Sequence, residues 1–323
     1  MNVSHYLEFE DVVTGGIRES VRNQRKMLAE LDIEYAQTPR LDADVLHLNL
    51  MGPRSIYYAK RARRRGIPVV IHTHVTAEDF GDSFRFTNVL SKPLRPYLEA
   101  AYELGDVLVC PSEYNRRLIE TYVETETTVI TNGVDREKLE GFETLRSEYL
   151  RRYDLTPPVV FLVGHVIKRK GLRTFVETAR RMPGLDFAWF GPLDRSLKGR
   201  STRRLIERSP ENCTFTGYVD DIRGAYAAGD VFFFPTHEEN EGIALLEAMS
   251  AGKPVLVRDI ETFSWLEDGH DCLKSDGPFE EDLERLNDPK LRERLGENAI
   301  RTSEAFTLPN TARRLRTLYE EVA

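Results

Sequence analysis

The sequence predicts an α/β protein made of two doubly wound, Rossmann-like domains. Short apolar runs alternate with longer helical segments along the chain, and glycine- and proline-containing loops separate them. A length of 323 residues with ordinary apolar and charged fractions is sufficient for two such domains. In sheets of this class, ligands bind at the loops that follow the carboxyl ends of the strands.

Composition excludes several classes of protein. The formal net charge of −8 argues against nucleic acid as the main partner. No apolar run approaches the length that spans a bilayer, and the N-terminus lacks a basic segment followed by a long apolar core. We therefore expect a cytoplasmic protein that can still touch a membrane surface. The cysteines show none of the paired spacings of zinc sites, so we expect structural roles for Cys110, Cys213 and Cys272.

The N-terminal part begins with a strand over residues 1–7 and a helix over 17–31. Gly15 and Gly16 lie at their junction. Glycines here let the backbone approach a phosphate, although a glycine pair in a loop is also ordinary turn chemistry. Further strands are expected at residues 45–49, 69–74, 106–110 and 128–131.

A basic cluster follows the second of these strands. Pro53 begins a helix, and basic residues without acidic ones run from Arg54 to Arg65. Such a cluster can attract anionic lipid head groups, or it can be a solvated helix face whose last arginines complement the helix dipole. Its C-terminal end contains Arg61, Arg63, Arg64 and Arg65.

Two histidines end the strand at residues 69–74. Strand alternation places His72 and His74 on one face. A histidine at a strand tip can touch a substrate or can serve as a hydrogen-bonding core residue, and the pattern leaves both open. Residues 75–90, which include Phe84 and Phe86, predict a long excursion of the kind that is usually functional.

The domain boundary is expected near residue 153. The composition turns charged and helical from Arg136 to Arg152, and Thr156-Pro-Pro158 breaks the chain before a new strand at 159–163. We therefore expect an N-terminal domain at 1–153 and a C-terminal domain at 154–308. Pro309 opens a last helix, residues 309–323, which we expect to pack back toward the N-terminal domain.

A glycine-bounded basic loop follows the first strand of the second domain. It reads Gly164-His-Val-Ile-Lys-Arg-Lys-Gly171 and precedes a helix at 172–182. Lys168, Arg169 and Lys170 suit a diphosphate, because cations neutralise the charge that a leaving nucleotide accumulates. The glycine spacing is not that of a Walker loop.

The segment from Asp230 to Val257 reads as strand, acidic loop, helix, turn and strand. Glu239 and Glu247 stand eight residues apart within it. Carboxylates accept hydrogen bonds from hydroxyl groups, and the free amides of a helix N-terminus bind anions, so the pair suits a nucleotide-sugar. The two acids could equally complement the helix dipole. Beyond Val257 the chain is charged, and we expect it to be helical.

Several of these segments together resemble the GT-B fold and, more narrowly, the retaining glycosyltransferases of family 4. The sequence is similar to bacterial glucosyltransferases that glycosylate diacylglycerol. The resemblance rests on Phe232-Phe-Phe-Pro235, Glu238-Glu-Asn-Glu-Gly-Ile243, Pro254-Val-Leu-Val-Arg-Asp-Ile260, Lys168-Arg-Lys-Gly171, Trp189-Phe-Gly191 and His72-Thr-His74.

The resemblance implies two domains facing across a cleft, the first binding the acceptor and the second the donor. It implies metal-independent, retaining transfer of a hexose, expected to be glucose, from UDP-glucose as substrate to a lipid such as diacylglycerol, with no cofactor. It shifts the basic cluster toward contact with an anionic membrane, at the cytoplasmic face. Alternatives are transfer to a polyprenyl-linked or soluble glycan, or a non-catalytic nucleotide-sugar-binding subunit.

The resemblance also implies roles for individual residues. Arg169 and Lys170 would bind the diphosphate, Glu239 the sugar and Glu247 the ribose, while His74 would lie near the reacting carbon. The catalytic set is His74, Arg169, Lys170 and Glu239. The donor-binding set is Gly15, Gly16, Gly217, Asn240, Gly242, Ile243 and Glu247. The acceptor and membrane set is Arg61, Arg63, Arg64, Arg65, Phe84 and Phe86.

Overall fold

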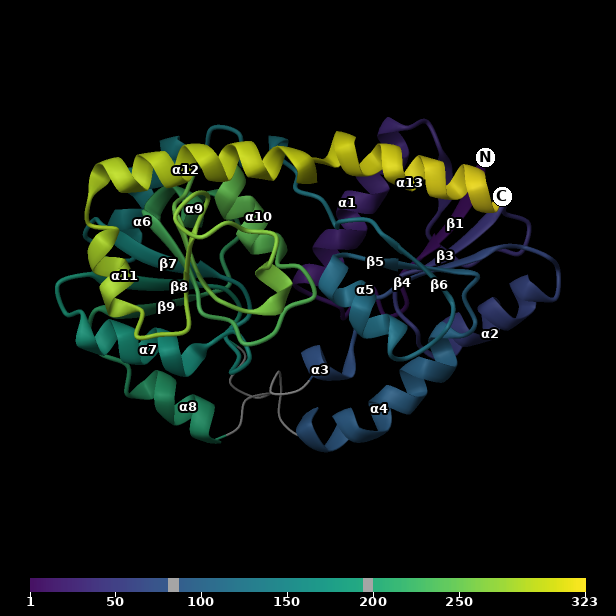
Figure 1. Ribbon diagram of the computed structural model, residues 1–323, viewed down its shortest axis with the longest axis horizontal. Helices are drawn as coiled ribbons and strands as arrows, with labels where there is room; N and C mark the ends of the chain where they lie inside the picture. The colour runs from purple at the N-terminus through teal and green to yellow at the C-terminus, as the bar shows by residue number, and fades with distance from the viewer. Residues whose placement is uncertain (81–86, 194–199) are drawn as a thin grey trace. The chain divides into compact units, whose positions relative to one another are not determined.

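The structure, a computed structural model, describes residues 1–80, 87–193 and 200–323 (Figure 1). Phe84 and Phe86 therefore lie outside the described residues. The chain divides into two compact units, the first formed by Met1–Phe80, Asn88–Gly133 and Phe306–Ala323, and the second by Val134–Ala305. Within the described residues each unit contains a six-stranded parallel sheet.

The first unit has the strand order β2-β1-β3-β4-β5-β6. Its elements are β1 (Asn2–Tyr6), α1 (Gly16–Glu30), β2 (Glu34–Ala36), β3 (Val45–Leu48), α2 (Pro53–Arg63), β4 (Val69–His72), α3 (Ala77–Phe80), α4 (Thr87–Tyr102), β5 (Val107–Cys110), α5 (Glu113–Glu120), β6 (Glu126–Val129) and α13 (Leu308–Val322). The order reverses between β1 and β3, so the loops after these strands flank a topological switch point.

Alternate residues of these strands pack into two separate apolar clusters, as a doubly wound sheet requires. Leu46 and Ile71 pack with residues of α2, α4 and α5. Val45 and Val70 pack with residues of α1 and α13. The helices α2 and α13 therefore cover opposite faces of one sheet, and α13 lies beside α1 (Figure 1).

The second unit has the strand order β12-β11-β10-β7-β8-β9. Its sheet is formed by β7 (Val159–Val163), β8 (Asp186–Phe190), β9 (Cys213–Gly217), β10 (Val231–Phe234), β11 (Val255–Arg258) and β12 (Leu273–Ser275). Counted from β7, this is the 3-2-1-4-5-6 order of Rossmann domains, with the switch point between β7 and β10.

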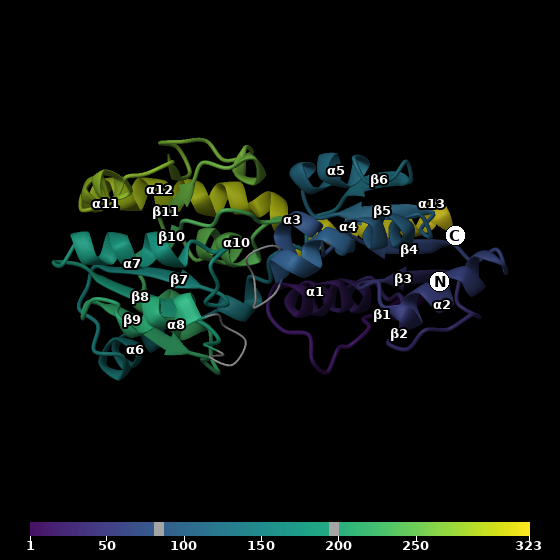
Figure 2. The same ribbon diagram turned by 90° about the horizontal axis from the view of Figure 1, so that it is seen from below.

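Helices surround this second sheet, and α10 lies beside α12 (Figures 1 and 2). They are α6 (Arg146–Arg152), α7 (Leu172–Arg181), α8 (Arg200–Glu207), α9 (Arg223–Ala228), α10 (Ile243–Ser250), α11 (Glu280–Arg285) and α12 (Pro289–Ser303). Short 3-10 helices are η1 (Glu137–Leu139), η2 (Phe142–Leu145), η3 (Glu261–Phe263) and η4 (Glu304–Phe306). In the described part of the chain, no helix is long and apolar enough to cross a membrane.

The units divide at Gly133 and Val134, about twenty residues before the expected boundary. Residues 134–153 belong to the second unit because α6 packs on α9. The hydroxyl of Tyr149 donates to the carbonyl of Asp221 at 2.7 Å. A Cβ atom at Gly224 would lie 2.1 Å from the Tyr149 ring, so only glycine permits this approach. At the other end of the chain, α13 packs within the first unit, where Tyr319 is fully buried.

Two secondary-structure expectations were wrong. The segment after Val257 contains the strand β12, which pairs with β11. The excursion expected at residues 75–90 contains α3 and the start of α4, which continues through Pro93 and Pro96. Three residues of strand and two prolines inside a helix are weak local signals, and tertiary packing overrides them.

Candidate functional site

The loops after β7 and β10 meet at the switch point of the second sheet. Gly171 ends the basic loop with a φ of 77°, and a Cβ atom there would lie 2.2 Å from the carbonyl oxygen of Pro235. The amide of His237 donates to the carbonyl of Arg169 at 2.8 Å. The basic and acidic loops are thus held together through their backbones, as the strand order requires.

Side chains from both loops converge on Glu239. Nζ of Lys170 lies 2.6 Å from Oε1 of Glu239, and a terminal nitrogen of Arg169 lies 3.4 Å from the same oxygen. Oγ1 of Thr236 donates to that oxygen at 3.1 Å, and Oγ1 of Thr262 donates to the Glu239 carbonyl at 2.8 Å. The structure therefore brings together three of the four predicted catalytic residues.

The electrostatics of this group keep Glu239 ionised. Burial raises the pKa of its carboxyl, but the charges of Lys170 and Arg169, together with two hydrogen bonds, outweigh burial, so the pKa lies below its usual value. The Glu239 side chain is only 9% exposed. A buried carboxylate beside two cations can accept hydroxyl hydrogen bonds, and the cations can neutralise a phosphate.

The N-terminus of α10 follows directly after Glu239. Gly242, with a φ of 100°, is its N-cap, and in the described part of the chain no side chain caps this helix. The amides that follow Gly242 begin at Ile243, and both Asn240 and Ile243 are half-buried. Uncapped amides at a helix N-terminus form a binding position for anions or hydroxyl oxygens.

Glu247 lies one to two turns further along α10 and has different partners from Glu239. Nζ of Lys138 donates to Oε1 at 2.8 Å, and the hydroxyl of Tyr226 donates to Oε2 at 2.6 Å. The sequence had not singled out Lys138 or assigned a role to Tyr226. No local pattern could have found Lys138, because 109 residues separate it from Glu247.

Gly217 is the last residue of β9, at the outer edge of the second sheet. Its φ of 74° lies in the left-handed region, which favours glycine. The carbonyl of Gly217 accepts a hydrogen bond from the amide of Gly191 at 3.0 Å. It therefore ends a strand on the same side of the sheet as the basic and acidic loops.

In the first unit, His72 and His74 share a face, as strand alternation predicts. Their rings stack with centroids 4.1 Å apart. Nε2 of His74 lies 3.0 Å from Oδ1 of Asn49, and Nδ1 of His72 lies 3.1 Å from Nε2 of Gln24. Burial lowers the pKa of His74 to about 3, so the ring is neutral at physiological pH.

These two histidines belong to a larger buried group at the carboxyl ends of β1, β3 and β4. The ring of His47 stacks on His72 at 6.0 Å, and the ring of His5 meets His47 edge-on at 5.0 Å. Burial lowers the pKa of His5 to about 4. Among the described residues, no histidine, cysteine or carboxylate group is arranged to hold a metal ion.

Gly15 and Gly16 form the start of α1 in the first unit. Gly15 is the N-cap of the helix with a φ of 71°, a conformation that side chains rarely adopt. A Cβ atom at Gly16 would meet nothing within 4 Å. The junction therefore favours glycine at position 15, whereas position 16 has room for a side chain among the described residues.

The basic cluster lies at the C-terminal end of α2. Arg61, Arg63, Arg64 and Arg65 are all exposed. Arg61 stacks over the ring of Tyr57, which is 52% exposed. The helix thus presents cations and an aromatic ring to solvent on one face of the first sheet, where α2 packs.

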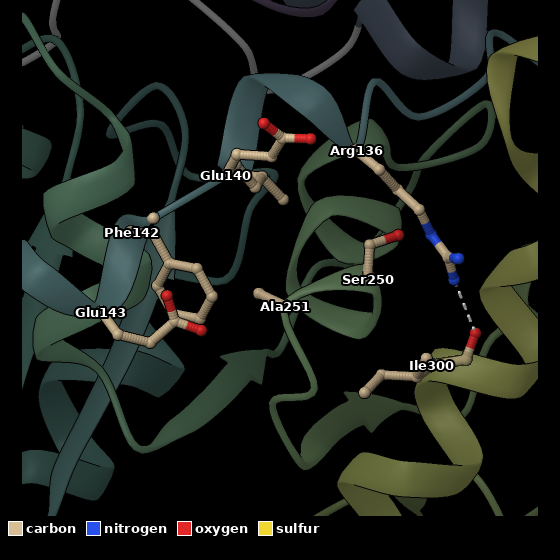
Figure 3. Close-up of a pocket in the computed structure, with 9 residues that line it drawn as sticks. Arg136, Glu140, Phe142, Glu143, Ser250, Ala251 and Ile300 are labelled. Atoms are coloured by element: carbon tan, nitrogen blue, oxygen red, sulfur yellow. Dashed lines mark hydrogen bonds between the residues drawn. The ribbon is translucent and has the colours of Figure 1, made fainter.

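A cavity of about 220 Å³ opens elsewhere on the second unit (Figure 3). Arg136 borders it and donates to the carbonyl of Ile300 at 3.0 Å. The cavity is lined by Arg136, Leu139, Glu140, Gly141, Phe142, Glu143, Ser250, Ala251 and Ile300. Its described lining contains none of the residues that the sequence predicted for donor binding or catalysis.

Comparison with known proteins agrees with this architecture. Residues 12–138 match the family described as Glycosyltransferase Family 4, and residues 157–285 match Glycosyl transferases group 1. The processive diacylglycerol alpha-glucosyltransferase of Acholeplasma laidlawii is 32% identical over 317 residues, which cover 95% of this chain and 94% of that protein. The alpha-galactosylglucosyldiacylglycerol synthase of Streptococcus pneumoniae is 27% identical, over 80% of this chain and 71% of that protein.

Solved structures with the same fold include Anabaena HepE in complex with UDP and glucose, with a TM-score of 0.76, 14% identity and 99% coverage of both chains. WaaG, a glycosyltransferase involved in lipopolysaccharide biosynthesis, has a TM-score of 0.69 and 18% identity, covering 98% of this chain and 99% of that chain. The sequence match to the Acholeplasma enzyme over nearly the whole chain, and the two parallel sheets, lead to one conclusion. The chain belongs to the family 4 glycosyltransferases of the GT-B fold.

Proposed function

We propose that this glycosyltransferase moves glucose from UDP-glucose to a hydroxyl group of a membrane glycerolipid of the diacylglycerol type. The observation that carries the donor half is the convergence of Lys170 and Arg169 on Glu239 at the switch point of the second sheet. A nucleotide-sugar offers a diphosphate for the two cations and sugar hydroxyls for the carboxylate.

The acceptor half is supported by two observations. The Acholeplasma relative, named as a diacylglycerol glucosyltransferase, is 32% identical over nearly the whole chain. The exposed basic end of α2, with Tyr57 beside Arg61, has the composition of a surface that binds anionic lipid head groups. We therefore propose a peripheral enzyme at the cytoplasmic face of the membrane, with its acceptor drawn from the bilayer.

The proposed reaction retains the configuration of the anomeric carbon. The acceptor hydroxyl oxygen forms a bond to that carbon on the face from which the diphosphate departs. The bond from the anomeric carbon to the phosphate oxygen breaks, and the acceptor proton passes to the leaving phosphate. Lys170 and Arg169 neutralise the charge that the diphosphate gains, so we propose that no metal ion is required. His74, as a neutral imidazole, is proposed to contact the sugar near this carbon.

Within the donor site we propose that Glu239 binds the transferred sugar, assisted by the amides after Gly242, and that Glu247 binds the ribose. Gly217 is proposed to lie beside the nucleobase. Glu239→Gln should then lower kcat roughly 100-fold, because a contact to the reacting sugar acts in the transition state. Glu247→Gln should mainly raise the donor KM, roughly tenfold. Equal changes of kcat and KM in both variants would contradict this division of roles.

A substrate screen tests the proposal as a whole. The purified protein is incubated with UDP-glucose, UDP-galactose, GDP-mannose or ADP-glucose, each with total lipid extract or with soluble oligosaccharides. We expect nucleotide release with UDP-glucose only when lipid is present, undiminished by EDTA, and an α-linked product by NMR. Release with soluble acceptors alone would overturn the lipid assignment, and loss of activity in EDTA would overturn the metal-independent mechanism.

A further inference from the structure

Both carboxylate oxygens of Glu247 have a partner inside the second unit. Lys138 donates to Oε1 at 2.8 Å, and Tyr226 donates to Oε2 at 2.6 Å. The Glu247 side chain is 8% exposed, so water has little access to it. Lys138 comes from η1 and Tyr226 from α9, so the carboxylate of α10 is held from two separate elements.

These two contacts fix the orientation of the Glu247 carboxylate, and its oxygens can still accept further hydrogen bonds. A carboxylate has about four lone-pair positions on its two oxygens, so the one side-chain donor that each oxygen has among the described residues leaves about two positions available. The ribose of a nucleotide carries two adjacent hydroxyl donors. The two remaining acceptor positions of the carboxylate therefore match the two hydroxyls of one ribose.

We propose that Lys138 and Tyr226 are positioning residues for the donor nucleotide. They fix the orientation of Glu247, so that it receives the ribose hydroxyls without rearrangement. This proposal rests on the proposed role of Glu247 as the ribose ligand. It adds two residues that act on the ribose through Glu247.

A purely structural role is the competing explanation. Lys138 and Tyr226 could simply connect η1 and α9 to α10, in which case their loss would lower stability without changing how the protein discriminates between nucleotides. The ratio of the dissociation constants for UDP and 2′-deoxy-UDP separates these explanations. The ratio reports the ribose contact alone, because both ligands share the base and the diphosphate.

The experiment titrates UDP and 2′-deoxy-UDP by calorimetry into the full-length wild-type protein, Lys138→Met and Tyr226→Phe. We expect the wild-type protein to bind UDP roughly tenfold more tightly than the deoxy ligand. In Tyr226→Phe and in Lys138→Met this preference should fall several-fold, because Glu247 loses one of the two contacts that orient it.

Matched variants control for general effects. Lys290→Met removes an exposed lysine of α12, and Tyr149→Phe removes another buried hydroxyl whose hydrogen bond goes to the carbonyl of Asp221. Both should keep the wild-type ratio. Lys138→Arg keeps a cationic donor at this position and should retain most of the preference, and Tyr226→Phe decides the question if Lys138→Met fails to fold.

Two outcomes would overturn the inference in distinguishable ways. If the wild-type protein binds UDP with a preference over 2′-deoxy-UDP and that preference is unchanged in Lys138→Met and Tyr226→Phe, or in Tyr226→Phe where Lys138→Met does not fold, the positioning role is wrong and the proposed donor site stands. If the wild-type protein binds neither ligand, or binds both equally, the proposed ribose contact itself is wrong.

Discussion

Lys170 and Glu239 form a buried ion pair of 2.6 Å that joins the loops after two neighbouring strands. Their side chains are 14% and 9% exposed. The pair lies where the strand order of the second sheet reverses, between β7 and β10. Its geometry connects the basic loop to the acidic loop, so a change in either partner affects both binding and stability.

Replacement of Lys170 by Met should destabilise the second unit. Glu239 would remain buried, and among the described residues its remaining ion-pair partner would be Arg169, at 3.4 Å. We expect a loss of about 3 kcal/mol in the free energy of unfolding, since breaking one side of a buried pair leaves an uncompensated charge. Urea unfolding followed by tryptophan fluorescence measures it, because both tryptophans, Trp189 and Trp265, lie in this unit.

The double variant Lys170→Met with Glu239→Gln serves as the control for that prediction. It removes both charges, so it should recover much of the lost stability. If Lys170→Met alone unfolds at the same urea concentration as the wild-type protein, the ion pair contributes nothing to the second unit.

Gly171→Ala should lower the stability of the second unit because of the backbone conformation at this position. The residue has a φ of 77°, and the added Cβ atom would lie 2.2 Å from the carbonyl oxygen of Pro235. We expect a loss of at least about 2 kcal/mol in the same urea experiment, because the left-handed conformation and the clash both oppose a side chain. Gly184→Ala is the matched control, since a Cβ atom there meets nothing within 4 Å. Equal midpoints for the two variants would show that the loops are not held in this way.

The buried histidines should make the first unit sensitive to acid. Burial lowers the pKa of His5 to about 4 and of His74 to about 3, from a usual value of 6.5. Between the folded-state pKa of each histidine and 6.5, the unfolded chain binds more protons than the folded chain. The free energy of unfolding therefore falls as pH drops below 6.5. Each histidine contributes a slope of up to about 1.4 kcal/mol per pH unit until the pH reaches its folded-state pKa.

Two optical signals distinguish the units during an acid titration. Tryptophan fluorescence reports the second unit alone, whereas far-ultraviolet circular dichroism reports both. We expect part of the circular dichroism signal to be lost at a pH where the fluorescence is still native. Simultaneous loss of both signals would show that the histidine group does not set the acid limit of the first unit.

The basic end of α2 should control binding to anionic vesicles. The variant with Arg61, Arg63 and Arg64 changed to Gln loses three exposed charges, and we expect vesicle affinity to fall on the order of 100-fold at low salt. A matched variant changes Arg313, Arg314 and Arg316 of α13, three exposed arginines on the opposite face of the same sheet. Co-sedimentation with phosphatidylglycerol vesicles measures both. The same loss in both variants would indicate dependence on net charge and not on α2.

The sequence was sufficient for the longer strands of both sheets and for the loops of the second unit. Strands such as β7 and β10 are continuous apolar runs ended by glycine or proline, which is the strongest local signal of a buried parallel strand. Neighbouring strands of a parallel sheet end at the same edge, so Lys170 and Glu239 could be expected to lie close together. The ion pair between them was not predicted and is seen only in the structure.

Other features depend on contacts that no local pattern reports. β2 and β12 are three-residue strands at the edges of their sheets and carry little periodicity. Lys138 reaches Glu247 across 109 residues, and the division at Gly133 depends on how α6 packs on α9. The strand pattern alone does not decide whether His72 and His74 are core residues or contact a substrate. The structure shows both rings buried in hydrogen-bonded contact, and their chemical role remains a prediction.

Formation of glucosyl-diacylglycerol is the most direct test of the proposed function. The purified protein is mixed with radiolabelled UDP-glucose and phosphatidylglycerol vesicles that contain diacylglycerol, and lipid-soluble label is followed with its product identified by mass spectrometry. We predict a labelled glucosyl-diacylglycerol with the wild-type protein, roughly 100-fold slower formation with Glu239→Gln, and none without diacylglycerol. Absence of labelled lipid with the wild-type protein, while UDP-glucose still binds, would contradict the assignment of a lipid acceptor.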